Sequence, residues 1–163
     1  MHAECEWKQN GFVVSTDPVR QDVDAIHAFL RHAYWSENIP RATVERALRY
    51  SLGFGLFDGA AQVGLARVVT DYTTFAYLCD VYVLASHRGR GLGRWLIECV
   101  MAHPQLQGLR RFNLVTRDAH GLYAPHGFRA LAKPENHMER RKPDIYKTAV
   151  AGGQSATQTE ART

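Results

Sequence analysis

The chain has 163 residues, of which 45% are hydrophobic and 22% are charged. This length and hydrophobic content fit one domain with one buried core and exclude a second full domain. The formal net charge is +4, but the twenty basic and sixteen acidic residues are interspersed, which argues against a nucleic-acid-binding surface.

The first third of the chain predicts one strand followed by two helices. Residues 12–15 form a short apolar strand, and Asp17-Pro18 is a typical start for a helix whose apolar residues recur from Val23 to Ala33. Residues 41–51 have the spacing of a second short helix. The loop between the two helices is rich in aromatic and polar side chains.

The middle third predicts three consecutive antiparallel strands and then a helix. The strands cover residues 53–57, 62–70 and 75–84, because turn signals such as Asp58-Gly59 separate these β-rich runs. From Leu92 onward, apolar residues recur at i, i+3, i+4, i+7 and i+8, which predicts an amphipathic helix. This helix begins within a glycine-rich run.

The last third predicts a strand, a short helix and two closing strands. The strand covers residues 112–116, the helix is centred on Leu122-Tyr123 and ends at Gly127, and the closing strands cover 128–131 and 138–141. This order of elements predicts an α/β (α+β) fold, in which helices cover a mixed sheet.

The composition also sets the expected domain limits. We expect an N-terminal extension over residues 1–11 and a single domain over residues 12–148. Residues 149–163 are small and polar without an apolar period, so they cannot bury enough surface to offset the entropy of ordering. A disordered tail is therefore expected there.

Cysteine content and the N-terminus bear on the compartment. Cys5, Cys79 and Cys99 are an odd number at wide spacing, and the latter two are interpreted as small buried hydrophobic residues. The N-terminus carries Glu4 and Glu6 where a signal peptide needs an apolar core, and no apolar run reaches membrane-spanning length. We therefore expect a cytoplasmic protein that binds neither a membrane nor a nucleic acid.

The glycine-rich segment Arg88-Gly89-Arg90-Gly91-Leu92-Gly93 joins the third of these strands to the long helix. The first turn of a helix has unpaired N–H groups and a positive dipole end, and glycines let a phosphate approach the backbone closely. The segment therefore predicts a phosphate site, although the glycines alone are also compatible with an ordinary strand-to-helix turn. Neither the dinucleotide fingerprint nor the nucleotide-triphosphate loop is present.

Two motifs of this sequence resemble motifs that occur in the same order in one protein family. Arg88-x-x-Gly91-x-Gly93 matches the pyrophosphate motif Arg/Gln-x-x-Gly-x-Gly/Ala of GNAT superfamily N-acetyltransferases, and the segment 122–128, Leu-Tyr-Ala-Pro-His-Gly-Phe, looks like the family's Leu-Tyr-x-x-x-Gly-Phe. The resemblance covers roughly residues 12–146. It implies a mainly antiparallel central sheet flanked by helices, with a splayed strand pair, and acetyl-CoA as the co-substrate.

The resemblance also implies which residues bind acetyl-CoA. Backbone groups of the strand before the loop would receive the pantetheine arm, and Thr116 stands where many members carry an asparagine on the pantetheine side, so that contact departs from the pattern. The expected cofactor-binding residues are Val81, Tyr82, Val83, Arg88, Gly89, Arg90, Gly91, Leu92, Gly93, Arg94 and Thr116.

Catalytic and substrate-binding candidates follow from the same resemblance. Tyr123 is the candidate general acid for the departing CoA thiolate, and its alternative role is an aromatic packed on the sheet. Asp80 lies in an otherwise apolar strand, so it is either a base or amine anchor, or a carboxylate that caps a loop or pairs with an arginine. Glu37 is the next carboxylate candidate, and Tyr34 lies in the loop that overhangs the acceptor pocket in the family.

The predicted function is transfer of an acetyl group to a primary amine of a small molecule, peptide or protein. The alternative is a noncatalytic acyl-CoA-binding regulatory module on the same fold. No metal is assigned, because the eight histidines form no close pair at metal-binding spacing. A homodimer is compatible with the closing edge strands, but the sequence leaves the assembly open.

Overall fold

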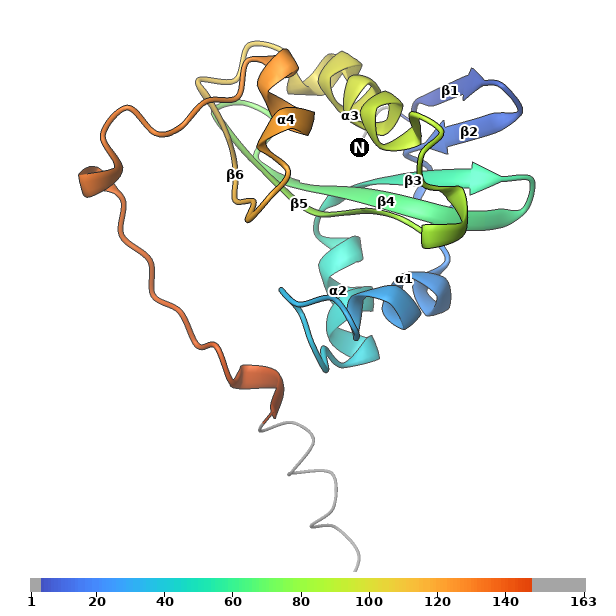
Figure 1. Cartoon of the computed structure of the whole chain (residues 1–163), viewed down its shortest axis with the longest axis horizontal. Helices are drawn as coiled ribbons and strands as arrows, with labels where there is room; N and C mark the ends of the chain where they lie inside the picture. The colour runs from blue at the N-terminus through green and yellow to red at the C-terminus, as the bar shows by residue number, and fades with distance from the viewer. Residues whose placement is uncertain (1–3, 148–163) are drawn as a thin grey trace, which may run out of the picture.

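A six-stranded sheet forms the centre of the protein (Figure 1). The computed structural model describes residues 4–147, and within them the strand order follows the chain from β1 to β6. The strands are β1 (Glu6–Gln9), β2 (Phe12–Ser15), β3 (Leu52–Asp58), β4 (Ala61–Thr70), β5 (Phe75–Val83) and β6 (Arg111–Leu114). Neighbouring strands are antiparallel except β5 and β6, which are parallel. The predicted mixed, mainly antiparallel sheet is confirmed.

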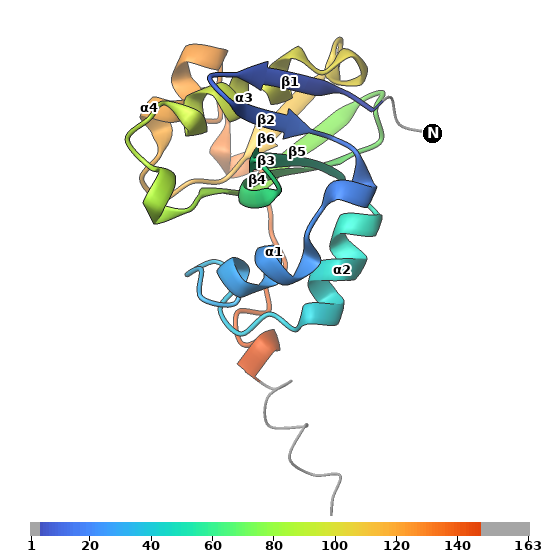
Figure 2. The same ribbon diagram turned by 90° about the vertical axis from the view of Figure 1, so that its right-hand side faces the viewer.

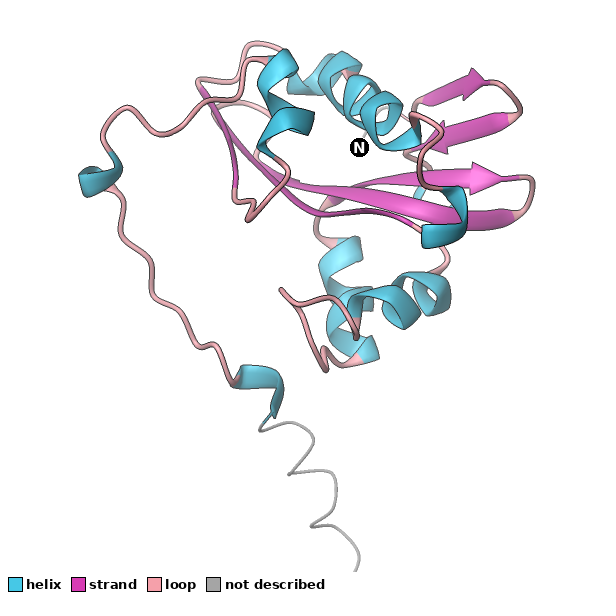
Figure 3. Cartoon of the chain, in the orientation of Figure 1, coloured by secondary structure: helices cyan, strands magenta, loops and turns pink. Residues whose placement is uncertain are grey.

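Helices cover both faces of the sheet, as Figures 2 and 3 show. The helices α1 (Val23–Leu30) and α2 (Arg41–Arg49) lie on one face, and α3 (Leu92–Ala102) and α4 (His120–Tyr123) lie on the other. Short 3₁₀ turns join these elements at Pro18–Arg20, Ala85–His87, Pro104–Leu106, Ala124–His126 and Pro134–Asn136. Each face therefore has its own apolar cluster, and the sheet separates the two.

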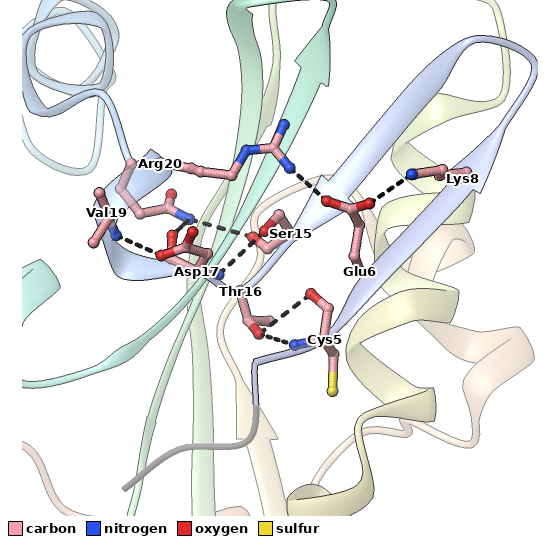
Figure 4. Close-up of polar contacts among 9 residues, drawn as sticks. Cys5, Glu6, Lys8, Ser15, Thr16, Asp17, Val19 and Arg20 are labelled. Carbon is pink, nitrogen blue, oxygen red and sulfur yellow. Dashed lines mark hydrogen bonds and ion pairs between the residues drawn. The ribbon is translucent and has the colours of Figure 1, made fainter.

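The sheet begins earlier than the expected domain boundary at residue 12. Part of the segment 1–11, predicted as an extension, forms β1 and pairs with β2. The connection is the two-residue turn Asn10-Gly11, in which both residues have positive φ angles of 50° and 83°, as a tight hairpin requires. Figure 4 shows how the next segment is fixed: Arg20 and Lys8 both form ion pairs with Glu6, at 2.6 and 2.9 Å.

Helix α3 buries the apolar face that its spacing predicted. Leu92, Trp95, Leu96, Cys99 and Val100 are all buried against the sheet. Burial of large apolar side chains contributes roughly 1.5–3 kcal/mol each before the entropy cost. This packing fixes the position of the helix start relative to the end of β5.

Strands β5 and β6 pair over only part of their length. The pairing runs from Phe75 with Arg111 to Leu78 with Leu114, and no residue from 79 to 83 is paired with β6. On its other side β5 stays paired with β4, with a register shift opposite Ala66 and a φ of 51° at Asp80. The bulge turns β5 away from β6. The splayed strand pair is thereby confirmed.

The chain after α4 departs from the prediction. The short helix ends at Gly127 as predicted, where φ is 87° and a residue without a side chain is favoured. The closing strands predicted over 128–131 and 138–141 do not form, so that part of the prediction is wrong. A strand needs a hydrogen-bonding neighbour, and residues 129–145 are all exposed. Residue 148 and the predicted tail over 149–163 lie outside the described residues.

Candidate active site

The segment 88–93 forms a turn that ends at the N-terminus of α3. Gly89 and Gly91 have φ angles of 74° and 76°, in the left-handed region that favours glycine. Gly91 caps the helix, and no heavy atom beyond its chain neighbours lies within 4 Å of where a Cβ would stand at either glycine. The first N–H groups of the helix, on Leu92, Gly93 and Arg94, face an open approach, which fits a phosphate group.

The arginines of this segment have different surroundings. The guanidinium Nε of Arg88 donates to the Val83 carbonyl at 3.0 Å, which ties the turn to the end of β5. The guanidinium of Arg90 lies 4.9 Å from the centre of the Phe12 ring. All three arginines, including Arg94, are exposed. They can supply positive charge near the helix start, while the backbone supplies the donors.

The end of β5 presents its backbone to the gap left by β6. Val81 and Val83 pack toward the α3 face, whereas the Tyr82 ring stacks on Phe29 of α1 at 3.7 Å. Burial raises the pKa of the Tyr82 hydroxyl, so this side chain stays neutral. Since residues 79–83 lack a partner on the β6 side within the described chain, this edge can receive an extended ligand by strand-like hydrogen bonding.

Tyr123 lines the same cavity as Asp80 and Val81 of β5. Its side chain is only 7% exposed and packs edge-on against Phe128, with ring centres 6.0 Å apart. Burial raises the pKa of its hydroxyl, with a smaller contribution from Tyr34. A phenol whose pKa lies above its ordinary value of about 10 is fully protonated at neutral pH and can donate a proton.

A cavity of about 540 Å³ joins the candidate residues. Its lining includes Tyr123, Asp80, Val81, Thr116 and Tyr34. Thr116 is half-buried, and its hydroxyl accepts a hydrogen bond from the Ala119 N–H at 3.0 Å, so it organises the turn before α4. The structure thus brings together the predicted acid, one predicted carboxylate and part of the predicted cofactor site.

Asp80 has a partner on each carboxylate oxygen. Arg67 donates from Nε to Oδ2 at 2.7 Å, and Trp35 donates from Nε1 to Oδ1 at 3.0 Å. Burial lowers the pKa of the Arg67 guanidinium, but the neighbouring negative charge, chiefly of Asp80, raises it overall. The pairing alternative for Asp80 is therefore the one that the geometry favours over a free anchor.

The loop between α1 and α2 supplies one wall of the cavity. Tyr34 is 56% exposed, packs edge-on against Trp35 at 5.0 Å and carries the Arg117 guanidinium 4.0 Å from its ring centre. Glu37 is exposed and is not among the residues that line this cavity. Of the two substrate-binding candidates, the structure therefore places only Tyr34 at the site.

Comparisons with known proteins agree with this geometry. A family model described as an acetyltransferase (GNAT) domain matches residues 51–130. A Gibberella zeae protein named as an acetyltransferase is 38% identical, and the match covers 72% of this chain and 78% of that protein. A crystal structure of a protein assigned to the GNAT acetyltransferases, from Xanthomonas campestris pv. campestris, is 51% identical with a TM-score of 0.82. It covers 85% of this chain and 99% of that chain.

This chain belongs to the GNAT acetyltransferase family. A structure of AAC(6')-Iy in complex with the bisubstrate analogue CoA-S-monomethyl-acetylneamine has a TM-score of 0.55 at 17% identity, covering 74% of this chain and 90% of that one. At that identity the likeness shows the shared fold. GNAT proteins use acetyl-CoA, and the open glycine turn before α3 fits its pyrophosphate.

Sequence reasoning missed two arginines that contact residues of the candidate site. Arg67 on β4 lies next to Asp80 only because β4 and β5 pair, and Arg117 reaches Tyr34 across the cavity. No local motif marks either arginine. A charged residue within the apolar strand β4 was the one signal for Arg67, since a buried charge calls for a partner.

Two further properties of the described part of the chain bear on cofactors and location. Residues 4–147 contain no group of three or more histidine, cysteine or acidic side chains arranged to hold a metal ion. None of the helices within that range combines the length and apolar character needed to traverse a bilayer.

Proposed function

We propose that this protein transfers an acetyl group from acetyl-CoA to a primary amine by direct attack, with Tyr123 as general acid. The proposal rests on the location of the Tyr123 side chain. A buried, protonated phenol lies in the cavity that also contains the free edge of β5 and the overhanging Tyr34. The acceptor is an amine of a small molecule, a peptide or a protein.

The proposed acetyl-CoA site lies along the unpaired backbone at the end of β5 and the exposed N–H groups at the start of α3. Acetyl-CoA supplies the activated acetyl thioester when it is bound. The N–H groups at the start of α3, with Arg88, Gly89, Arg90, Gly91, Leu92, Gly93 and Arg94 around them, would hold the pyrophosphate. The backbone of Val81, Tyr82 and Val83, with Thr116 beside it, would align the pantetheine arm and offer an N–H group to the developing oxyanion.

The acceptor side requires a neutral amine and a proton for the leaving thiolate. The amine nitrogen forms the new bond to the acetyl carbon, the carbon–sulfur bond breaks, and the Tyr123 hydroxyl gives its proton to the sulfur. The attacking nitrogen loses its extra proton to water. Asp80 acts here as a positioning residue, because its carboxylate fixes Trp35 in the cavity wall and is neutralised by Arg67.

Replacement of Tyr123 tests the general acid directly. The Tyr123→Phe enzyme keeps the ring packing but lacks the proton, so kcat should fall by roughly 10²–10⁴-fold, measured as release of the CoA thiol with an amine acceptor. Tyr50→Phe is the control, because Tyr50 is 75% exposed and is not among the residues that line the cavity. A Tyr123→Phe enzyme that turns over within twofold of the wild type would remove Tyr123 from the mechanism.

A noncatalytic acyl-CoA-binding module is the second candidate. The Arg67–Asp80 ion pair favours it, because a neutralised carboxylate is a poor base for an ammonium substrate. Such a module would bind acetyl-CoA but release no thiol with any amine of a broad panel of diamines, amino sugars and peptides. Thiol release with any of these amines rules out the module.

A further inference from the structure

The end of β5 has an incomplete set of backbone partners. Residues 79–83 are not paired with β6. On the other side the pairing with β4 skips Asp80 and Val81, because the register shifts at Ala66. A strand is held in its sheet by a ladder of hydrogen bonds, and this segment has only part of that ladder. Side-chain contacts therefore have to fix the backbone of residues 80–82.

The backbone at Asp80 has a conformation that disfavours a side chain. Its φ is 51°, in the left-handed region, where a residue other than glycine persists only if its surroundings hold it. Two groups hold the Asp80 carboxylate: Arg67 donates to Oδ2 at 2.7 Å, and the Trp35 indole donates to Oδ1 at 3.0 Å. One of these groups comes from β4, and the other comes from the loop after α1.

The Tyr82 side chain is held from the same side of the sheet. Tyr82 is only 6% exposed, and its ring stacks on that of Phe29 in α1, with the ring centres 3.7 Å apart and the planes 7° from parallel. Tyr82 also belongs to the apolar cluster that contains Ile26 and Leu30. Two large rings in such close contact leave little freedom to each other, so the stack limits the movement of the backbone that carries Tyr82.

Phe29 and Trp35 form one aromatic unit, which we call the aromatic clamp. Their ring centres lie 6.3 Å apart, and the ring planes are inclined by 46°. Trp35 contacts Asp80 and Phe29 contacts Tyr82, so the clamp holds the two β5 residues that flank Val81. Val81 itself packs against the cluster on the α3 face. The backbone from Asp80 to Tyr82 is therefore fixed by contacts on the α1 side of the sheet.

We propose that Phe29 is a positioning residue for acetyl-CoA binding and for the transfer step. Through its stack with Tyr82 it holds the N–H and C=O groups of residues 81–83 in the orientation that the pantetheine arm and the developing oxyanion require. Phe29 is not among the residues that line the cavity with Tyr123, so its effect passes through Tyr82. The inference rests on the proposed function, because it concerns the same backbone edge.

The geometry of hydrogen bonds makes such positioning effective. An N–H group stabilises an oxyanion best at about 2.7–3.1 Å, and a hydrogen bond weakens steeply when its angle falls below about 120°. A displacement of about 1 Å can lower a reaction rate by roughly a hundredfold. Leucine in place of Phe29 would keep an apolar contact with Tyr82 but would present no flat face to its ring. The Tyr82 ring and its backbone would then be free to shift.

The binding of two ligands tests the positioning role without activity. Acetyl-CoA and 3′-phospho-ADP share the nucleotide and the pyrophosphate, but only acetyl-CoA has the pantetheine arm. In calorimetry, Phe29→Leu should raise the Kd for acetyl-CoA by about tenfold or more, because the hydrogen bonds to the arm are misaligned. The Kd for 3′-phospho-ADP should stay within about twofold, because this ligand meets only the turn at 88–93. Loss of affinity for both ligands, or for neither, would overturn the positioning role.

Two further variants separate positioning from general packing. Phe29→Tyr keeps the flat ring and should bind acetyl-CoA within about threefold of the wild type. Ile26→Val is the matched control, because Ile26 is fully buried in the same cluster on α1, and its loss of one methyl group leaves both rings of the stack in place. It should lower Tm but change neither Kd. An acetyl-CoA affinity that falls as far in Ile26→Val as in Phe29→Leu would mean that loosened packing is sufficient, and would overturn the assignment to Phe29.

Kinetics then separate this inference from the proposed function. With saturating acetyl-CoA, Phe29→Leu should lower kcat by about tenfold or more and leave the KM for the amine within about threefold, whereas Phe29→Tyr should restore kcat. A higher KM for the amine at unchanged kcat would assign Phe29 to the acceptor wall and overturn its role in the transfer step. A wild type that binds acetyl-CoA but releases no thiol would refute the proposed function. The selective loss of acetyl-CoA binding in Phe29→Leu would still support the positioning of β5.

Discussion

At the scale of single residues, burial decides which ionisable groups of this protein are reactive. Tyr123 and Tyr82 are both buried and both have a raised hydroxyl pKa, but only Tyr123 lines the cavity between the splayed strands. The Asp80 carboxylate is already paired with Arg67 and Trp35. Tyr123 therefore remains available as a proton donor, whereas the Asp80 carboxylate is already engaged by its two partners.

The role of Asp80 predicts a particular kinetic change. Asp80→Asn keeps the shape and can still accept from Trp35, but it leaves the buried Arg67 charge without its partner. We expect the KM for the amine to rise at least tenfold while kcat changes less than threefold, in steady-state kinetics with saturating acetyl-CoA. A fall in kcat at unchanged KM would instead assign Asp80 to the chemical step.

The thiols give a prediction that depends on pH. Burial raises the pKa of Cys79 and that of Cys99 to about 12, against an ordinary value of 9.0. This rise in the pKa lowers the thiolate fraction at pH 8 by roughly a thousandfold. The thiolate is the form that reacts with an alkylating reagent. Mass spectrometry after iodoacetamide treatment should show both cysteines unmodified in the native protein and modified in denaturant. Rapid native labelling of either would contradict the burial.

At the scale of elements, the site depends on where β5 ends and α3 begins. The β4–β5 bulge turns the end of β5 away from β6, and the turn at 88–93 then begins α3 with its N–H groups exposed. Packing of Trp95 and Leu96 against the sheet fixes the helix start. The proposed donor site is therefore made of backbone, with side chains that hold the backbone in place.

Gly91 tests this backbone site. Gly91→Ala adds a Cβ at a φ of 76°, where a side chain costs about 1 kcal/mol, and it narrows the approach to the helix start. We expect the Kd for acetyl-CoA to rise at least tenfold in calorimetry. Gly59→Ala is the matched control: its φ is 58°, its surroundings are equally open and it lies in the β3–β4 turn. A Kd for Gly91→Ala that matches the Kd for Gly59→Ala would mean that the approach at Gly91 is not part of the acetyl-CoA site.

At the scale of the whole molecule, local patterns predicted most of the sheet and all four helices. The spacing from Leu92 to Val100 identified α3, because one helix face is buried along its entire length. Strand β1 was overlooked, although Asn10-Gly11 is a strong hairpin signal, because Glu6–Gln9 has little apolar character. The strand predicted over residues 138–141 does not form, because a local pattern does not show whether a neighbouring strand is there to pair with it.

The site was predictable to a similar extent. The glycine turn and Tyr123 were predicted from local motifs. The structure places the turn at the start of α3 and Tyr123 in the cavity beside β5. Arg67 and Arg117 come from separate elements and meet Asp80 and Tyr34 only in the folded chain. Long-range contacts of this kind depend on strand register, which no local pattern fixes.

The whole molecule should respond to its co-substrate as one cooperative unit. A ligand that binds only the folded state at about a hundred times its Kd stabilises it by about 2.7 kcal/mol, which for a domain of this size raises Tm by roughly 5–10 °C. Thermal unfolding with and without acetyl-CoA measures this shift. ATP is the control, because it carries phosphates but no pantetheine arm to pair with the free edge of β5, and it should give a much smaller shift. Equal Tm shifts with both ligands would mean that only the phosphate-binding turn contributes to binding. No Tm shift with acetyl-CoA would mean that the start of α3 does not bind acetyl-CoA.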